Sequence, residues 1–206
     1  MDNTALYKLS YGVFMLSTTV DGKANGCITN TCMQVANNPT RIAIACINTN
    51  LTCEMIRKSG VFTLSLLDET CTFDLIKHFG LQSGRNVDKM TGQNLKQDAK
   101  GLYYLTDHTT AFISATVVDS MDLGSHTLFI ATVDDAENIS GKAPLTYADY
   151  QSKVKPKPAE APKQERKIVG WRCKICGYVY KESELPGNYV CPVCGHPSDD
   201  FEPIYE

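Results

Sequence analysis

The sequence predicts a mainly β protein, in which an antiparallel barrel with two short helices precedes a small metal-binding domain. Residues 1–150 contain many short β-branched and aromatic runs separated by turn residues, a pattern typical of antiparallel barrels and not of doubly wound sheets. Residues 171–206 carry four cysteines in two C-x-x-C pairs. Residues 151–170 hold three prolines, alternating charges and almost nothing apolar, which predicts an extended flexible linker.

The predicted strands of residues 1–150 begin with a hairpin, in which the turn signal DGK joins YGVFMLSTTV to ANGCITNTCMQV. Further strands are predicted at RIAIACI, VFTLSLL, GLYYLTD, TTAFISATVVDSMDL and HTLFIATVDDAEN. One helix is predicted at NLTCEMIRKSG, with Asn50 or Thr52 as its cap and Gly60 at its end. A second helix, TCTFDLIKHFG, ends at Gly80. Neither G-x-G-x-x-G nor G-x-x-x-x-G-K-[ST] occurs, so neither common nucleotide-binding loop is present.

Charge and hydropathy exclude several classes of protein. The net charge of −3 is too small to indicate a nucleic-acid-binding protein, and the basic linker lacks the aromatic residues and amphipathic periodicity of such a site. No apolar run reaches the roughly 18 residues of a membrane span. The N-terminal segment lacks a basic stretch followed by a long apolar one, so we expect no signal peptide and a cytoplasmic location. Five scattered cysteines are expected to be small buried hydrophobic residues: Cys27, Cys32, Cys46, Cys53 and Cys71.

The paired cysteines predict a metal site. In a C-x-x-C pair the chain folds back so that both thiolates point at one ion, and two pairs make a tetrahedral site that suits zinc or iron. The four ligands are Cys173, Cys176, Cys191 and Cys194. Gly177 and Gly195 follow the two pairs and allow backbone N–H groups to point at the sulfur atoms, which tunes a redox potential. The spacing itself leaves the choice between zinc and iron open.

The motifs WRCKICGYVY and CPVCG resemble rubredoxin, in which four cysteines hold one iron ion. The resemblance covers about residues 171–204 and implies a single Fe3+/Fe2+ centre. The segment between the two pairs is shorter than in free-standing rubredoxins and is more similar to rubredoxin modules fused to larger proteins. A structural zinc ribbon is the alternative.

Residues 1–150 resemble the flavin reductase-like, FMN-binding split-barrel family. The ordered pieces are STTVDGKANG, a segment rich in Thr with a following NP, NLTCEMIRKSGVFTLSLL, SGRNVDK and PLTYADY. The resemblance implies a Greek-key-like split barrel that binds FMN at the interface of a homodimer and uses NAD(P)H as co-substrate.

A helix N-terminus near residues 50–52 offers free N–H groups to the FMN phosphate, and two basic side chains can add charge. Hydroxyls, amides and backbone N–H groups of two further segments would face the flavin ring. By resemblance, the flavin-binding residues are Thr29, Asn30, Thr31, Cys32, Cys46, Asn48, Thr49, Asn50, Thr52, Arg85 and Lys89. His126 lies where the family often places a histidine on the nicotinamide side of the flavin. The chemistry belongs to the cofactors, so no residue is predicted to act as a strong acid or base.

The two domains together predict a converter of two-electron into one-electron transfer, in which NAD(P)H reduces FMN and the iron site passes electrons to a partner protein. Fusions of this kind in anaerobic bacteria imply a flavodiiron protein as acceptor, and hence O2 or NO scavenging. Two alternatives remain open at this point. The tail could be a zinc ribbon on a flavin-binding sensor, or the chain could be an electron carrier that NAD(P)H does not reduce directly.

Overall fold

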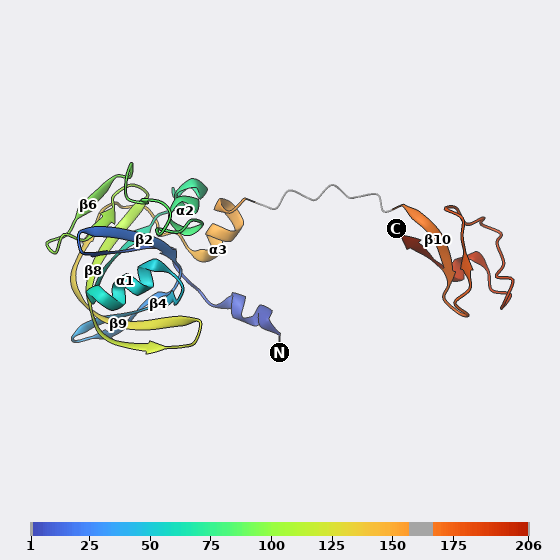
Figure 1. The fold of residues 1–206 in the computed structure, drawn as a ribbon, viewed down its shortest axis with the longest axis horizontal. Helices are drawn as coiled ribbons and strands as arrows, with labels where there is room; N and C mark the ends of the chain where they lie inside the picture. Colours follow the sequence, from blue (N-terminus) through green and yellow to red (C-terminus); the bar gives the residue numbers. More distant parts are fainter. Residues whose placement is uncertain (1, 157–166, 206) are drawn as a thin grey trace. The chain divides into compact units, whose positions relative to one another are not determined.

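The structure is a computed structural model that describes residues 2–156 and 167–205. It divides into two compact units, Met1–Pro156 and Lys157–Glu206, which we call unit 1 and unit 2 and describe separately. Figure 1 shows the elements of each unit. Unit 1 corresponds to the predicted barrel and unit 2 to the predicted metal-binding domain.

The predicted linker, residues 151–170, has regular structure at both ends. The π-helix η2 (Tyr150–Val154) packs Tyr150 and Val154 against a core cluster of unit 1. Strand β10 begins at Ile168, which pairs with Tyr205. These apolar residues flank the Pro/Lys-rich stretch and find partners in the two units, so the prediction of an extended segment is wrong there. Residues 157–166 lie outside the described residues.

Unit 1 is a seven-stranded antiparallel sheet in the order β2-β1-β5-β8-β9-β4-β3. Its two edge strands, β2 and β3, follow each other in the chain, and the barrel is split between them. A separate two-stranded sheet pairs β6 with β7. The strands are β1 (Phe14–Val20), β2 (Lys23–Thr29), β3 (Cys32–Asn37), β4 (Thr40–Ile47), β5 (Val61–Leu67), β6 (Leu95–Gln97), β7 (Tyr103–Leu105), β8 (Thr109–Asp122) and β9 (His126–Asn138). The mainly β, split-barrel prediction is confirmed.

The predicted hairpin forms, but its second arm is two strands and not one. Asp21 and Gly22 turn the chain with φ values of 50° and 75°, as a tight hairpin turn requires. β2 ends at Thr29 because β1 begins at Phe14, its partner, and offers no further pairing. The hydroxyl of Thr29 then donates to Ala45 O (3.2 Å), and Ala45 N donates to Thr31 O (3.3 Å). These two hydrogen bonds hold the segment after β2 against β4, and β3 then pairs with β4.

Both predicted helices form, and the first has the caps that the sequence predicts. Helix α1 (Leu51–Ser59) begins after Asn50, whose Oδ1 accepts from Thr52 N at 3.0 Å, and ends at Gly60 with φ 69°. Helix α2 (Phe73–Gly80) begins after Thr72, whose hydroxyl accepts from Leu75 N. The other helical segments are η1 (Asn3–Lys8) and α3 (Tyr147–Asp149). α1 packs on β1 and α2 on β2, so that each helix covers part of the barrel.

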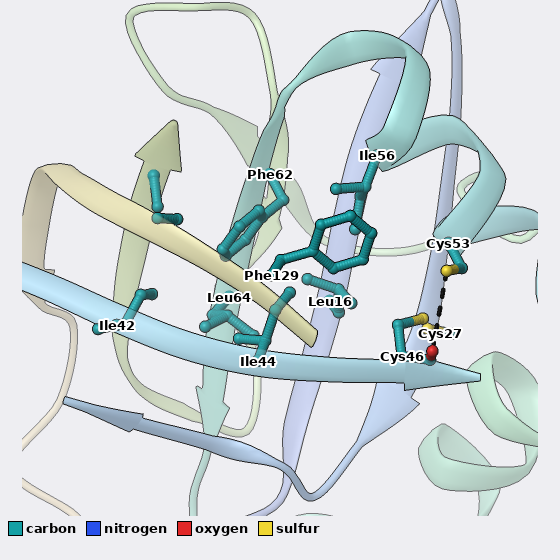
Figure 2. Packing of buried hydrophobic residues seen from close by; sticks show 12 residues of the cluster. Leu16, Cys27, Ile42, Ile44, Cys46, Cys53, Ile56, Phe62, Leu64 and Phe129 are labelled. Atoms are coloured by element: carbon teal, nitrogen blue, oxygen red, sulfur yellow. Dashed lines mark hydrogen bonds between the residues drawn. The ribbon is translucent and has the colours of Figure 1, made fainter. Parts of the chain in front are cut away.

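The core of unit 1 has two parts because β1 is buried on both faces. Side chains alternate along a strand, so neighbouring residues point to opposite sides. Leu16 packs inside the barrel with Phe62 and Phe129, and Figure 2 shows this cluster. Met15 packs on the other side with Phe79 of α2. The first cluster extends to the ends of β2 and β4, where the candidate site lies.

Unit 2 is a three-stranded antiparallel sheet in the order β11-β10-β12. The strands are β10 (Ile168–Cys173), β11 (Val179–Tyr180) and β12 (Phe201–Tyr205), and a single turn of 3-10 helix, η3 (Ser198–Asp200), precedes the last. Among its described residues, the buried cluster consists of Cys173, Cys191 and Phe201, with aromatic residues packed around them. So small a core is insufficient to stabilise a domain without a further contribution.

In the described part of the chain, no helix has both the length and the hydropathy that a membrane crossing needs.

Candidate functional site

A pocket of about 260 Å³ lies beside the split of the barrel. It brings together six of the residues predicted to contact flavin or nicotinamide: Thr29, Asn30, Thr31, Cys46, Asn50 and His126. Its remaining lining residues are Val13, Cys27, Ile28, Ala45, Ile47, Ile76, Gly80, Leu81, Tyr147 and Tyr150. We call it the split pocket. Its volume lies just below the roughly 300–1,000 Å³ of typical small-molecule sites, so these walls enclose only part of a nucleotide-sized ligand.

The bend between β2 and β3 forms the polar wall of the split pocket. Thr29 Oγ1 accepts from Thr31 N at 3.3 Å while it donates to Ala45 O, and Thr31 Oγ1 donates to Asn30 Oδ1 at 3.2 Å. These local bonds fix three consecutive polar residues in the pocket wall. Hydroxyl and amide groups held in this way can serve a ring edge that carries both donors and acceptors.

Helix α1 begins at the split pocket. Asn50 lines the pocket and caps the helix, and its Oδ1 accepts from Thr52 N, so the N-terminal end of α1 lies next to the pocket. The N-terminus of a helix attracts anions through its free N–H groups and through the helix dipole. Thr52, also predicted to bind flavin, is fully buried and accepts from Asn25 Nδ2 at 2.9 Å. It therefore supports the pocket from behind.

Lys89 is a buried cation next to the split pocket. Its side chain is 3% exposed, and its ammonium donates to Gly26 O (3.0 Å) and Phe79 O (2.8 Å). Each of these carbonyls directly precedes a pocket-lining residue, Cys27 or Gly80. In the described part of the chain no carboxylate pairs with this ammonium. Burial lowers the pKa of Lys89, so the site stabilises the charged form less than water does and an arriving anion would offset that cost.

Arg85 is not in the split pocket. It forms an ion pair with Glu54 and lines a second, larger groove of about 1060 Å³ beside the β1–β2 hairpin. The prediction placed Arg85 and Lys89 together because they are close in the sequence. The chain between them turns, so that one side chain faces the outer groove and the other the interior.

Three further predicted residues lie away from the pocket lining. Asn48 is engaged by its neighbours: it donates to Asp122 Oδ1 (3.0 Å) and Gly124 O (2.8 Å) and accepts from Arg57 and Thr127. Thr49 is exposed in the turn before α1. Cys32 packs against the barrel core, and burial raises the pKa of its thiol to about 12.

His126 starts β9 and lines the split pocket, and its Nδ1 lies 2.8 Å from Ser125 Oγ. The Asn48 bonds hold the turn that precedes it, since Asn48 N donates to Ser125 O at 3.0 Å. Asn48 therefore positions the pocket wall that carries His126. The prediction missed Cys27, although strand alternation places it on the same side as Thr29. It also missed Tyr147 and Tyr150, which lie in the PLTYADY motif.

The four paired cysteines of unit 2 form the second site. Their sulfur atoms lie within 4.8 Å of one another, with Cys173–Cys194 at 3.7 Å and Cys176–Cys191 at 3.5 Å. A tetrahedron with metal–sulfur bonds of about 2.3 Å has sulfur–sulfur edges of about 3.8 Å. The sulfur atoms therefore already have the separation that a single tetrahedral ion requires.

The two cysteine pairs have matching backbones. Gly177 N donates to Cys173 O and Gly195 N to Cys191 O, both at 2.9 Å, and the two glycines have φ values of 76° and 72°. The positive φ that the sequence predicts for both glycines is confirmed. Although burial opposes it, backbone N–H groups of Cys194 and Val193 lower the pKa of the Cys191 thiol to about 7. This loop thus favours the Cys191 thiolate, the form that binds a metal, whereas burial and the neighbouring cysteines raise the pKa of Cys194 to about 12.

The metal site lies at the surface on one side. Cys173 and Cys191 are buried, Cys194 is half-buried and Cys176 is exposed. The apolar side chains of Ile175 and Val193 are also exposed, at 56% and 68%. The site is therefore open to solvent mainly at Cys176.

Comparisons with known proteins find relatives of both units. Residues 6–155 match the model of the flavin reductase like domain, and residues 171–202 match that of the rubrerythrin, rubredoxin-like domain. The chain is 35% identical over 99% of its length to the high molecular weight rubredoxin of Moorella thermoacetica, covering 100% of that protein. It is 35% identical over 73% of its length to the ferric-chelate reductase (NAD(P)H) of Archaeoglobus fulgidus, covering 89% of that protein.

Among solved structures, the flavin reductase PheA2 in its native state superposes with a TM-score of 0.60 at 28% identity, over 71% of this chain and 93% of that one. The flavin reductase HpaC complexed with NADP+ has the same fold, with a TM-score of 0.60 at 22% identity, over 70% of this chain and 89% of that one.

Proposed function

This chain belongs to the flavin reductase-like domain family and carries a rubredoxin-like domain, and we propose that it passes electrons from NAD(P)H through FMN to one iron ion. It is thus an NAD(P)H-dependent electron-transfer oxidoreductase. The observation that carries the proposal is the presence in one chain of a flavin reductase-like barrel with an anion-ready pocket and a preformed four-thiolate site. The first suits a two-electron reductant and the second a one-electron carrier.

In the split pocket, the residues divide into those that would hold the phosphate and those that would hold the ring. The ammonium of Lys89 and the first-turn N–H groups of α1 supply positive charge for a phosphate. The polar run from Thr29 to Thr31 supplies hydrogen-bonding groups for the ring edge, and Tyr147 and Tyr150 supply apolar surface. His126, on the opposite wall, would orient the nicotinamide. When bound, flavin supplies hydride acceptance and single-electron release, and the protein supplies binding and orientation.

In unit 2, Cys173, Cys176, Cys191 and Cys194 would hold the iron, and the backbone N–H groups that point at their sulfur atoms would tune its potential. The exposed edge at Cys176, with its apolar neighbours Ile175 and Val193, would receive the electron-accepting partner. We propose a flavodiiron protein that reduces O2 or NO as this partner. The resemblance of the two-domain chain to fusions in anaerobic bacteria supports this proposal.

Mixing the full-length protein with NADH or NADPH under anaerobic conditions tests the electron path. We expect the flavin absorbance and the red absorbance of a ferric four-thiolate site to bleach together, and a purified flavodiiron protein with O2 to restore both. A preparation whose iron-type absorbance is absent and whose metal content is zinc would support the zinc-ribbon alternative. Bleaching by dithionite but by neither pyridine nucleotide would support the carrier alternative. Rapid-scan visible spectroscopy with metal analysis distinguishes the three.

We further propose that the barrel forms a homodimer that completes the flavin site. The split pocket encloses less volume than a nucleotide needs. Large apolar side chains are exposed on β3, β4 and the β8–β9 hairpin, near that pocket: Met33, Val35, Ile47, Met121 and Leu123. A surface of this kind marks an interface.

Met33→Asp, Val35→Asp and Met121→Asp combined are expected to convert a dimer into monomers and to weaken FMN binding. Burying three carboxylates in an interface opposes association. Sedimentation velocity and FMN titration measure the two effects. As a control, Val87→Asp changes an exposed side chain in the larger groove and is expected to leave the dimer intact. A monomeric wild-type protein with full FMN affinity would contradict the proposal.

A further inference from the structure

Three thiols gather at one end of the barrel core, where β2, β4 and α1 meet. Cys27, Cys46 and Cys53 belong to one buried cluster, and Figure 2 shows them close to one another. Cys53 Sγ lies 3.8 Å from Cys46 O. Cys27 and Cys46 also line the split pocket, whereas Cys53 is fully buried. Two of the three thiols are therefore both adjacent and within reach of a small molecule in the pocket.

The strands that carry this pair are not neighbours in the sheet. In the strand order, β2 stands at one edge and β4 next to the other edge. They approach each other across the split, where Thr29 Oγ1 donates to Ala45 O. The side chains of Cys27 and Cys46 lie close to each other at this gap, and both line the split pocket. A covalent bond between their sulfur atoms would close the barrel at the point where the sheet leaves it open.

The two thiols have different surroundings. Cys27 lies against Cys46, Thr52, Lys89 and Asn50, and these contacts, the one with Cys46 foremost, lower the pKa of its thiol despite burial. The contact with Cys27 and then burial raise the pKa of Cys46. Cys27 is therefore the nucleophile of the pair, because the thiolate is the reactive form, and Cys46 is the thiol held next to it.

The barrel thiols do not form a metal site. Within residues 2–156 and 167–205, the four cysteines of unit 2 are the one group whose ligand atoms all meet closely enough to hold a single ion. Cys27 and Cys46 can instead react with each other as a pair of thiols. In such a pair, the sulfenic acid formed on one cysteine reacts with the thiol of the other to give a disulfide.

We propose that Cys27 and Cys46 form a redox-active pair that a hydroperoxide converts into a disulfide across the split of the barrel. The Cys27 thiolate attacks one oxygen of H2O2, the O–O bond breaks, and a sulfenic acid and hydroxide form; the hydroxide takes the proton that Cys27 released on ionising and becomes the first water. The Cys46 sulfur then attacks the Cys27 sulfur, the S–O bond breaks, and the leaving hydroxide takes the Cys46 proton to form a second water. Two thiols and one H2O2 thus give one disulfide and two H2O.

The disulfide would act on the split pocket. It draws together the two strands that form facing walls and removes the Cys27 thiol from its contacts with Asn50 and Lys89. We therefore expect oxidation to weaken FMN binding by about tenfold or more, a loss of about 1.4 kcal/mol, and bound FMN to slow the oxidation. This part rests on the proposed flavin function, whereas formation of the disulfide does not.

Peptide mapping of the full-length protein tests the pair. The protein, with FMN removed or restored, is treated with H2O2, alkylated in denaturant and digested with trypsin. Cys27 and Cys46 fall on the neighbouring peptides 24–41 and 42–57, which also contain Cys32 and Cys53. We expect a linked peptide pair about 2 Da lighter than the two reduced peptides together, and fragmentation that assigns the link to Cys27 and Cys46. We expect more linked peptide without FMN than with it.

Two variants test which cysteines form the link. Cys46→Ser is expected to leave a sulfenic acid on Cys27 that dimedone traps, whereas Cys53→Ser, the matched change beside the pair, is expected to leave the link intact. A Cys46–Cys53 link, or full alkylation of Cys27 and Cys46 under conditions that oxidise Cys71, would overturn the proposal. Failure of the reduced wild-type protein to bind FMN would count against the flavin function and not against the pair.

Discussion

Cys191→Ser is expected to remove the iron from unit 2 and to unfold that unit while the barrel keeps its flavin. Cys191 is 2% exposed and is one of three residues in the buried cluster that the described part of unit 2 forms. A unit with so small a core derives its stability from the ion, because metal binding in such domains contributes about 10–16 kcal/mol at neutral pH for structural zinc. A serine hydroxyl does not replace a thiolate as a ligand of this kind of site.

Iron analysis, visible absorption and limited proteolysis of unit 2 measure the effect. NAD(P)H should still bleach the flavin of the variant but should no longer reduce a partner protein. Cys71→Ser is the matched control, because Cys71 is also buried but packs between α2 and β5 in unit 1, and its thiol donates to Thr72 O at 3.6 Å. A Cys191→Ser protein that keeps a full complement of iron would refute the four-cysteine assignment.

The fold could be predicted wherever the determinant was local. The hairpin at Asp21–Gly22, the cap at Asn50 and the positive φ at Gly60 depend on a few neighbouring residues, and all are found. The break between β2 and β3 was missed because it depends on where the partner strand β1 starts, and on a carbonyl of β4 that accepts the Thr29 hydroxyl. Neither can be read from the polar segment itself.

The two sites also differ in how far the sequence could predict them. The metal site could be predicted residue by residue, because each C-x-x-C pair is local and the two pairs only have to meet each other to complete the site. The split pocket is lined by residues of β2, β4, α2 and β9, by the Asn50 cap and by the segment after β9, so sequence position alone does not show which residues meet there. Arg85 and Lys89 are four residues apart, yet Arg85 lines the larger groove and pairs with Glu54, whereas the Lys89 ammonium is buried and donates to Gly26 O and Phe79 O.

Lys89→Met is expected to weaken FMN binding by about 10- to 100-fold, because a hydrogen bond to a charged group contributes about 1.5–3 kcal/mol. Methionine has a similar length and is apolar, so it fills the site without the charge. The ammonium uses two of its three donors on Gly26 O and Phe79 O, which leaves one donor for a phosphate. Isothermal titration of the flavin-free full-length protein measures the loss, and riboflavin, which has no phosphate, should bind both proteins alike.

The lowered pKa of Lys89 also predicts the direction in which FMN affinity changes with pH. Burial lowers the pKa of Lys89 in the flavin-free protein below the value of 10.5 that a lysine has in water. Between the lowered pKa and 10.5, Lys89 is protonated in the unfolded chain but not in the folded one. Below this pH window, burial of the charged lysine lowers the stability of the folded protein. This loss of stability disappears as pH rises through the window. Phosphate binding requires the protonated form, and FMN affinity should therefore fall as pH rises through the same window, with uptake of a proton.

Lys89→Met should abolish that alkaline loss of affinity, since no proton remains to be taken up. Lys100→Met is the matched control: Lys100 donates to Asp134 at 2.6 Å on the outer face of β8 and β9, and its loss should change neither the affinity nor its pH profile. An unchanged affinity in Lys89→Met would mean that the buried ammonium serves only the two carbonyls it contacts. The phosphate would then rely on the N-terminus of α1, and a lysine held without a carboxylate would have a purely structural role.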